Sequence, residues 1–521
     1  MIFTYNLIDE SWIPLLDSGG SLHYVGIREL LIHSHQYRQL AASLPQTNAA
    51  LYRLLLAILH RVFVGPSDPD HWEKLWESKA FDAAALDTYL NQWHERFDLF
   101  DPMHPFFQRQ NPDVEIKPAN ILLFNTGGGN PETLFDHNID DVPLQLSCEQ
   151  AALALVTAQS FSLAGLCHPQ LKLVYTDALC SRAAVFLLQG KSLFESFMLN
   201  LVRYNRMTPI PWRGQKDLPT WEMDDPFAQR TLPNGYLDYL TWPNRRVMLF
   251  PAEINGEIKV TRVSMAPGLV MNAEQRNPMH HYRIDRQAKA NQSPYKVLRF
   301  SEGRALWRDS SALLASGVDK TGRLAVLEWA EELKSNGLLP KRKLTLAAYG
   351  MATDPGKSKV FFYRGDQFTF SDELLGSSDL TAFLERALDR AEQVRAQLWG
   401  AVNRLAGLLL AHESNQNDAH RADPNAVKQL IAHWNPEGHY WQALELPFYH
   451  FMETLPDQPQ TAYEEWIELL RRTGRSVFEK ASEMAGTSSA AFKASANARV
   501  IFESGLKKVL EATPQEENKN A

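Results

Sequence analysis

The sequence has little cysteine and no long apolar run. Only Cys148, Cys167 and Cys180 occur in 521 residues, and no two of them have C-x-x-C spacing, so neither a disulfide framework nor a zinc knuckle is expected. No stretch reaches the roughly 18 apolar residues that cross a bilayer. The N-terminus lacks the basic and apolar parts of a signal peptide. We therefore expect a protein of the reducing cytoplasm without a membrane partner.

Motifs for catalysis and nucleotide binding are also missing. Neither G-x-S-x-G nor H-E-x-x-H occurs. Gly356-Lys357-Ser358 resembles the end of a P-loop, but Met351 stands where its first glycine belongs, and strand-like KVFFYR follows instead of a helix. Gly127 and Gly129 lack the third glycine of a dinucleotide fingerprint. Cys167 and His168 are sequence neighbours, which rarely face each other as nucleophile and base. We predict no catalytic residue, no cofactor and no resident metal.

One acidic cluster leaves an enzymatic alternative open. Asp136, His137, Asp140 and Asp141 follow the glycine run of residues 127–129, and carboxylates and imidazoles both bind divalent ions. A single cluster in a glycine-rich loop is more often simply solvated. A metal-dependent nuclease therefore stays an alternative hypothesis.

The composition is that of a large globular protein. Apolar residues make up 45%, aromatic residues 11% and charged residues 22%, which favours two or three domains. The net charge of −8 argues against a chain that coats nucleic acid by itself. Basic islands nevertheless occur, with seven Lys or Arg against two acids from Arg276 to Arg304, and a second cluster at 341–343. Such islands are able to contact phosphates, although a solvated basic face would look the same.

The first three quarters of the chain mix strand and helix signals. The turn residues 17–20 predict a strand pair, and Ser147 with Gln150 predicts a helix that starts with a capping box. Apolar spacing predicts helices over 48–63 and about 182–204. Two apolar runs around 351–358 predict a hairpin.

The last quarter has an almost purely helical pattern. Apolar residues recur every three or four positions from about 379, and breaks near 423, 456–459 and 486 separate further helices. Short breaks between amphipathic helices are typical of a bundle. We therefore predict an α+β protein, with a mixed domain at 1–375, an all-α helical bundle at 376–513 and a disordered tail at 514–521.

Several long strings resemble a known family. They are LIDESWIPLLDSGG, LYRLLLAILHRVF, RFDLFDPMHPFFQ, LLQGKSLFESFMLNLV, DLPTWE, YLTWPNRRV and NPMHHYR. In this order they are similar to the large subunit of the type I-E CRISPR Cascade complex, the CasA family. The resemblance implies a mixed N-terminal domain, a C-terminal four-helix bundle and no bond chemistry.

The same resemblance implies function and partners. The family recognises the protospacer-adjacent motif in double-stranded DNA, helps to open the duplex for guide-RNA pairing and recruits a helicase-nuclease. Its partners are the crRNA-loaded backbone, crRNA 5′-end-binding and small subunits of Cascade. In such complexes the target sequence is read by base pairing with the guide RNA. The protein itself then needs only to recognise a short motif and to wedge the duplex open. A purely architectural subunit is the alternative.

Site residues follow from the resemblance position by position. Residues 124–141 match the long L1 loop that reaches towards the guide RNA, with Phe124, Asn125 and Asn130 as candidates. The family's glycine loop falls at 162–168, where Gly165 is the one glycine.

Two further elements of the family are only partly matched. The wedge hairpin falls at 353–358, with Pro355, Gly356 and Lys357 but no glutamine, so a plain turn is the alternative. The basic finger falls near Gln275 and Arg276, for which a surface charge is the alternative.

Overall fold

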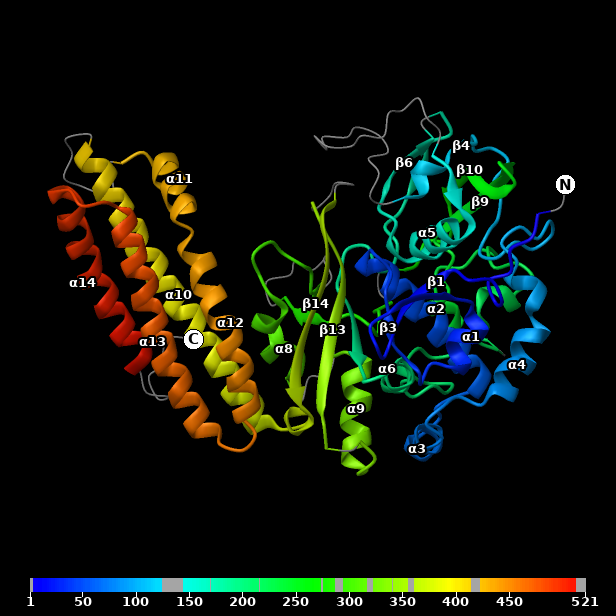
Figure 1. Ribbon diagram of the computed structural model, residues 1–521, viewed down its shortest axis with the longest axis horizontal. Coiled ribbons are helices and arrows are strands. Elements are labelled where there is room, and N and C mark those ends of the chain that lie inside the picture. Colours follow the sequence, from blue (N-terminus) through cyan, green and yellow to red (C-terminus); the bar gives the residue numbers. More distant parts are fainter. Residues whose placement is uncertain are drawn as a thin grey trace. The chain divides into compact units, whose positions relative to one another are not determined.

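The computed structural model describes residues 3–123, 144–168, 170–214, 216–272, 275–285, 294–315, 322–339, 341–354, 360–413 and 422–511 (Figure 1). The chain forms two compact units. Unit 1 comprises Met1–Leu306, Asp319–Pro340 and Leu344–Phe368, and unit 2 comprises Trp307–Val318, Lys341–Lys343 and Thr369–Ala521. The domain limits at 375 and 513 stay a prediction.

Unit 1 begins with a small sheet and helices. The sheet has the order β2-β1-β3, and β1 and β2 form the strand pair predicted around residues 17–20. Gly20 takes a φ of +84° in that turn, a conformation that favours glycine. The elements are β1 (Ile13–Asp17), β2 (Leu22–Val25), α1 (Ile27–Ile32), β3 (Tyr37–Leu40), α2 (Pro45–Phe63), α3 (Pro69–Glu77) and α4 (Ala83–Gln92).

A second sheet packs beside the predicted capped helix α5 (Cys148–Phe161). Its capping box is confirmed: the Ser147 hydroxyl accepts the Gln150 N–H, and the Gln150 side chain accepts the Ser147 N–H. The sheet has the order β4-β10-β5, with β9 paired to β10. Its strands are β4 (Lys117–Pro118), β5 (Leu146–Ser147), β9 (Arg245–Ile254) and β10 (Glu257–Pro267).

The predicted helix over 182–204 is wrong. The chain instead forms strand β8 (Val185–Gln189), turns, and then forms helix α6 (Leu193–Asn200). A Cβ on Gly190 would lie 2.3 Å from Cβ of Glu195, so the turn requires glycine, and the Ser192 hydroxyl caps α6 by accepting the Glu195 N–H. The apolar run of β8 is buried on both faces, which local periodicity cannot distinguish from a buried helix.

β8 joins a third sheet of the order β14-β13-β8. β13 (Lys343–Thr353) and β14 (Val360–Ser371) form the predicted hairpin, and a strand rather than a P-loop helix begins after Ser358. The other elements are β6 (Gly165–His168) paired with β7 (Leu173–Tyr175), α7 (Tyr236–Leu240), β11 (Tyr282–Ile284) paired with β12 (Tyr295–Val297), and α9 (Ala325–Ser335).

Unit 2 is helical, as the spacing predicts. Trp466 is buried and donates its indole N–H to the carbonyl of Ala387 at 2.9 Å, which ties two long helices together. In the described part of the chain, no helix is both long and apolar enough to span a membrane. The helices are α8 (Ser310–Leu314), α10 (Ser378–Glu413), α11 (Pro424–Trp434), α12 (Pro436–Thr454), α13 (Pro459–Met484) and α14 (Ser489–Glu511).

Candidate nucleic-acid interface

Gly165 is the first residue of the β6–β7 hairpin, opposite Tyr175. Successive side chains of a strand point to opposite faces. On one face, Tyr175 donates its hydroxyl and Cys167 its thiol to the Met265 carbonyl of β10, at 2.7 and 3.4 Å. On the other face, Leu166 and Val174 are 64% and 56% exposed. The hairpin is thus anchored on one face and free to meet another molecule with the other.

A buried arginine fixes both ends of this hairpin. Arg245 donates to the carbonyls of Leu163 and Thr176, at 2.9 and 2.8 Å, and its guanidinium lies 4.7 Å from the centre of the Tyr175 ring. Burial lowers the pKa of Arg245 to about 10, so the side chain still carries its charge at neutral pH. The backbone immediately before Gly165 is therefore held in one position.

The junction segment, residues 177–186, connects this hairpin with the β13–β14 hairpin. Asp177 accepts the Ala164 N–H at 2.8 Å with one carboxylate oxygen and Arg182 Nε at 3.0 Å with the other. Arg182 Nη1 in turn donates to Thr353 Oγ1 at 3.1 Å and to the Asp354 carbonyl at 2.9 Å. These bonds hold the residue before Gly165 and the end of β13 together within unit 1. Figure 1 labels the two strands concerned, β6 and β13.

The predicted finger residues lie elsewhere on unit 1. The guanidinium of Arg276 stacks 4.0 Å from the centre of the Tyr295 ring, and the Gln275 amide donates to the Arg276 carbonyl at 3.1 Å. Both line a cavity beside α9. The junction segment also reaches the chain that follows them, because Phe186 N–H donates to the Met279 carbonyl at 3.0 Å.

Six predicted contacts lie outside the described residues, namely Phe124, Asn125, Asn130, Pro355, Gly356 and Lys357, as does the acidic cluster 136–141. Sequence reasoning missed Asp177, Arg182 and Arg245. Asp177 accepts a backbone N–H, and Arg182 and Arg245 donate to backbone carbonyls far along the chain. No local pattern marks a side chain for such bonds. The predicted helix over 182–204 also overlaps the junction segment, so its long-range bonds were not expected.

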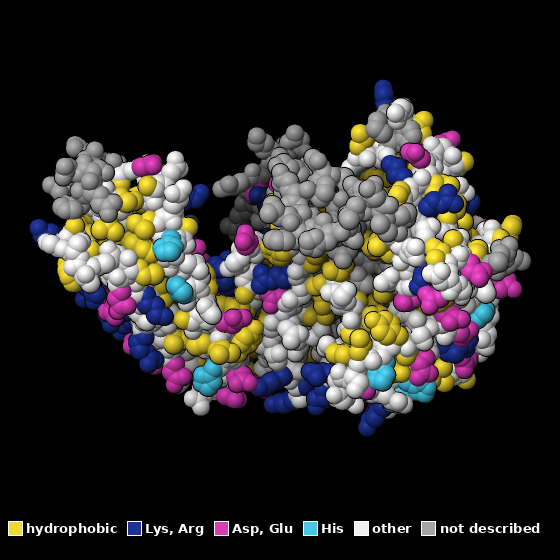
Figure 2. Space-filling model, turned by 45° about the horizontal axis from the view of Figure 1, so that its top comes forward, with side chains coloured by type: hydrophobic (Ala, Val, Ile, Leu, Met, Phe, Trp, Pro, Cys, Tyr) yellow, Lys and Arg dark blue, Asp and Glu magenta, His cyan; other side chains and the backbone are white. Residues whose placement is uncertain are grey.

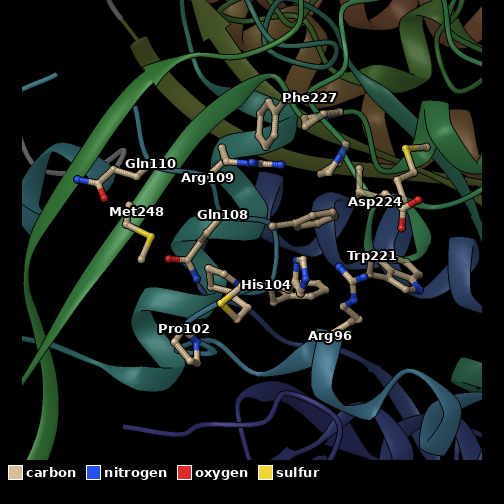
Figure 3. A pocket seen from close by; sticks show the side chains of 18 residues that line it. Arg96, Pro102, His104, Gln108, Arg109, Gln110, Trp221, Asp224, Phe227 and Met248 are labelled. Atoms are coloured by element: carbon tan, nitrogen blue, oxygen red, sulfur yellow. The ribbon is translucent and has the colours of Figure 1, made fainter. Parts of the chain in front are cut away.

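A separate cavity of about 310 Å³ lies against β9, and none of the predicted site residues lines it. Figure 3 shows Trp221 and Phe227 among its aromatic side chains, with Arg96 and Arg109 among the polar ones. Arg109 is paired with Asp225 at 2.9 Å. The cavity offers an apolar surface with cationic neighbours, and we assign it no role.

The fold and the site define a mixed α+β protein whose candidate site consists of anchored hairpins. A family model described as CRISPR-associated protein Cse1 matches residues 6–477. The chain belongs to this family, which confirms the resemblance seen in the sequence.

Two similar proteins support the assignment, and a third shares the fold. The chain is 33% identical to the CRISPR-associated protein CasA/Cse1 of Thermus thermophilus over 514 residues, 96% of each chain. A crystal structure of CasA from Thermus thermophilus matches with a TM-score of 0.79 at 29% identity, over 97% of this chain and 100% of the other. A chain from a structure described as a CRISPR RNA-guided surveillance complex has the same fold, with a TM-score of 0.74 at 19% identity over 96% and 99%.

Proposed function

We propose that this chain is the non-catalytic large subunit of a CRISPR surveillance complex in the cytoplasm, and that it recognises the protospacer-adjacent motif in double-stranded DNA. In this role it helps to open the duplex for guide-RNA pairing and recruits a helicase-nuclease. It assembles with the backbone, crRNA 5′-end-binding and small subunits. Family membership and the fold shared with a chain of such a complex support this assembly.

The observation that supports motif recognition most is the Asp177–Arg182 link. It holds the residue before Gly165 to the residues that precede the tip of the β13–β14 hairpin. A minor groove is narrow and carries a degenerate code, so a slim glycine backbone suits it. A hairpin whose strand β13 ends beside that backbone suits a wedge. The contacts that a wedge makes must offset the unstacking of bases, which costs a few kcal/mol per step. Lys357 is our candidate at the tip, and the L1 candidates Phe124, Asn125 and Asn130 are assigned to the guide RNA.

The test is a gel-shift series at one fixed salt concentration. The guide-loaded complex is compared with and without this chain on target duplexes with randomised flanks. The proposal predicts tighter binding for a subset of flanks only, and a loss of this selectivity with Gly165→Val or Lys357→Ala in an intact complex. Equal tightening for all flanks would leave the chain without a role in motif recognition.

An architectural subunit is the second candidate. It is favoured by exposed apolar side chains on the helices of unit 2, among them Trp399, Phe492 and Val500, because exposed apolar patches mark contacts with other proteins. Figure 2 shows hydrophobic side chains at the surface of these helices. Replacing Phe492 and Val500 by serine should then weaken assembly. If assembly alone changes with these variants, while Gly165→Val and Lys357→Ala leave target binding unchanged, the architectural function replaces the proposed one.

A further inference from the structure

The β6–β7 hairpin carries an apolar pair on its exposed face. Leu166 of β6 and Val174 of β7 are direct cross-strand partners, and they are 64% and 56% exposed. The side chains of such a pair lie on the same face of the hairpin, with Cβ atoms about 4.5–5.5 Å apart. Leu166 and Val174 therefore form one small, continuous apolar surface, which we call the outer pair.

The opposite face of the hairpin provides its attachment to the rest of unit 1. Cys167 forms a buried apolar cluster with Val114 and Ala266, and Leu173 and Tyr175 pack against this cluster. The outer pair takes no part in that cluster. A ligand that covers the outer pair would remove apolar surface from water, which favours binding.

The charge of the hairpin favours a polyanion as this ligand. Lys172 is the only charged residue in the sequence from 162 to 176, and it is exposed in the turn between the two strands. This stretch therefore has no carboxylate that would repel a phosphate. Asp177, which follows it, is paired with Arg182 at 3.0 Å. Because Leu166 directly follows Gly165, a duplex whose minor groove lies against Gly165 also reaches the outer pair.

The width of the minor groove admits the outer pair but not the whole hairpin. This groove is about 6 Å wide in B-DNA, which leaves room for a single row of side chains. Its walls are the sugar rings of the two strands. In DNA the 2′ carbons of these rings carry only hydrogen, whereas RNA displays 2′-hydroxyls in its minor groove.

An apolar side chain pressed against a 2′-hydroxyl takes water away from it and offers no hydrogen bond in return, which is unfavourable. The same side chain packs well against a C–H group. We propose that Leu166 and Val174 contact the deoxyribose walls of the duplex bound beside Gly165, and that they thereby select DNA over RNA in the flank of the target.

This inference rests on the proposed function, because it takes the flanking duplex as the ligand. The test uses the guide-loaded complex that contains this chain. Target duplexes carry deoxyribose, 2′-fluoro or ribose sugars in both strands of the flank, and are DNA elsewhere. Fluorinated sugars and ribose favour the same A-like pucker, but only ribose has the hydroxyl, so the ratio of their dissociation constants isolates the hydroxyl from the shape of the groove.

Gel shifts at one fixed salt concentration measure the three dissociation constants. We expect the ribose flank to bind about tenfold more weakly than the 2′-fluoro flank, as an unpaired hydroxyl in a contact would cause. The 2′-fluoro flank should bind more nearly like the deoxyribose flank, since it presents no hydroxyl to the outer pair.

Two variants locate this preference. Val174→Thr replaces a methyl by a hydroxyl at nearly unchanged shape, and Leu166→Asn places an amide on the same face. Each offers a hydrogen-bond partner to a 2′-hydroxyl and should bring the ratio of ribose to 2′-fluoro dissociation constants towards one. Leu22→Asn, at a 54% exposed position of β2, is the matched control and should keep the wild-type ratio. If circular dichroism shows that Leu166→Asn does not fold, Val174→Thr decides.

Equal binding of ribose and 2′-fluoro flanks by the wild type would overturn the inference, as would a wild-type ratio in an assembled Val174→Thr complex. A chain whose Leu166→Asn and Val174→Thr variants fold but no longer assemble would have a protein partner on the outer pair, which also overturns it. The proposed function is judged separately, on all-DNA duplexes with randomised flanks. A complex that selects flank sequences but ignores the 2′-hydroxyl would retain the proposed function and lose this inference.

Discussion

Unit 2 and the junction segment of unit 1 are held together by different means. In unit 2, apolar side chains at helical spacing fill the core between long helices, as Leu384, Val394 and Leu398 do on α10. In the junction segment, single polar side chains bond to distant positions; Arg182 reaches Thr353, 171 residues along the chain. Stability in unit 2 is therefore distributed over many contacts, whereas position in the junction segment depends on a few bonds.

Removing a large side chain from the core of unit 2 should reduce stability the most. Phe448 on α12 is fully buried and its ring lies 4.5 Å from that of Trp307. Phe448→Ala should lower the free energy of unfolding by about 3–5 kcal/mol, because a cavity remains. Leu446 on the same helix is 80% exposed, so Leu446→Ala should change it by less than about 0.5 kcal/mol. Urea denaturation followed by circular dichroism measures the free energy of unfolding of both variants. Similar losses for the two would contradict a unit 2 that is stabilised by its buried apolar side chains.

Removing the buried guanidinium beside Gly165 should cost nearly as much. Arg245→Met leaves the carbonyls of Leu163 and Thr176 without their donor, and each buried unsatisfied group costs about 1–3 kcal/mol. We expect a loss of about 2–4 kcal/mol and faster amide exchange in β6 and β7. The neighbouring Arg246→Met serves as the control, since Arg246 lies over the ring of Phe227. A β6–β7 hairpin with unchanged exchange would show that Arg245 does not anchor it.

A buried carboxyl gives unit 1 a pH-dependent stability. Burial raises the pKa of Asp217 to about 6, although it accepts the N–H groups of Leu237 and Asp238 at 2.7 and 3.0 Å. The unfolded pKa is about 3.9, so between pH 4 and 6 the folded state binds the extra proton. The contribution of Asp217 to stability is present below pH 4 and is lost as the pH rises to 6, by up to about 3 kcal/mol.

The variant Asp217→Asn isolates this contribution. The unfolding free energy of the wild type minus that of the variant should fall from pH 4 to pH 6 and stay constant from pH 7 to pH 8. Chemical denaturation at each pH measures this difference. A difference that does not change with pH would mean that the carboxyl titrates normally.

Removing the N-terminal cap of α5 should have the smallest effect on stability. Ser147→Ala removes the hydroxyl that caps α5 and should cost about 1 kcal/mol. Ser504→Ala, at an exposed position within α14, should cost nothing measurable. A cost near zero for Ser147 would mean that the tertiary contacts of α5 alone fix its start.

Local signals predicted most of the fold. The turn at 17–20, the capping box at Ser147, the hairpin of β13 and β14 and the helical C-terminal region all follow from residue types and spacing over a few positions. The helix over 182–204 failed because the buried strand β8 lacks the alternation that would distinguish it from a buried helix.

The candidate site was far less predictable. The resemblance gave Gly165 as a position, but nothing in the sequence pairs Asp177 with Arg182, or Arg182 with the end of β13. These bonds exist because the fold brings together residues that lie up to 172 positions apart. Such a geometry has no short-range signature.

The role of the Asp177–Arg182 link in motif recognition is tested with Arg182→Gln in the guide-loaded complex. Arg472→Gln, which replaces a mainly exposed arginine of α13, is the control. Binding of target duplexes with randomised flanks is measured at one salt concentration, after assembly of the complex has been verified. We expect Arg182→Gln to flatten the preference among flanks, because the hairpins of Gly165 and Thr353 are no longer held together, while the control keeps it. An unchanged flank preference with Arg182→Gln would show that the Asp177–Arg182 link has no part in motif recognition.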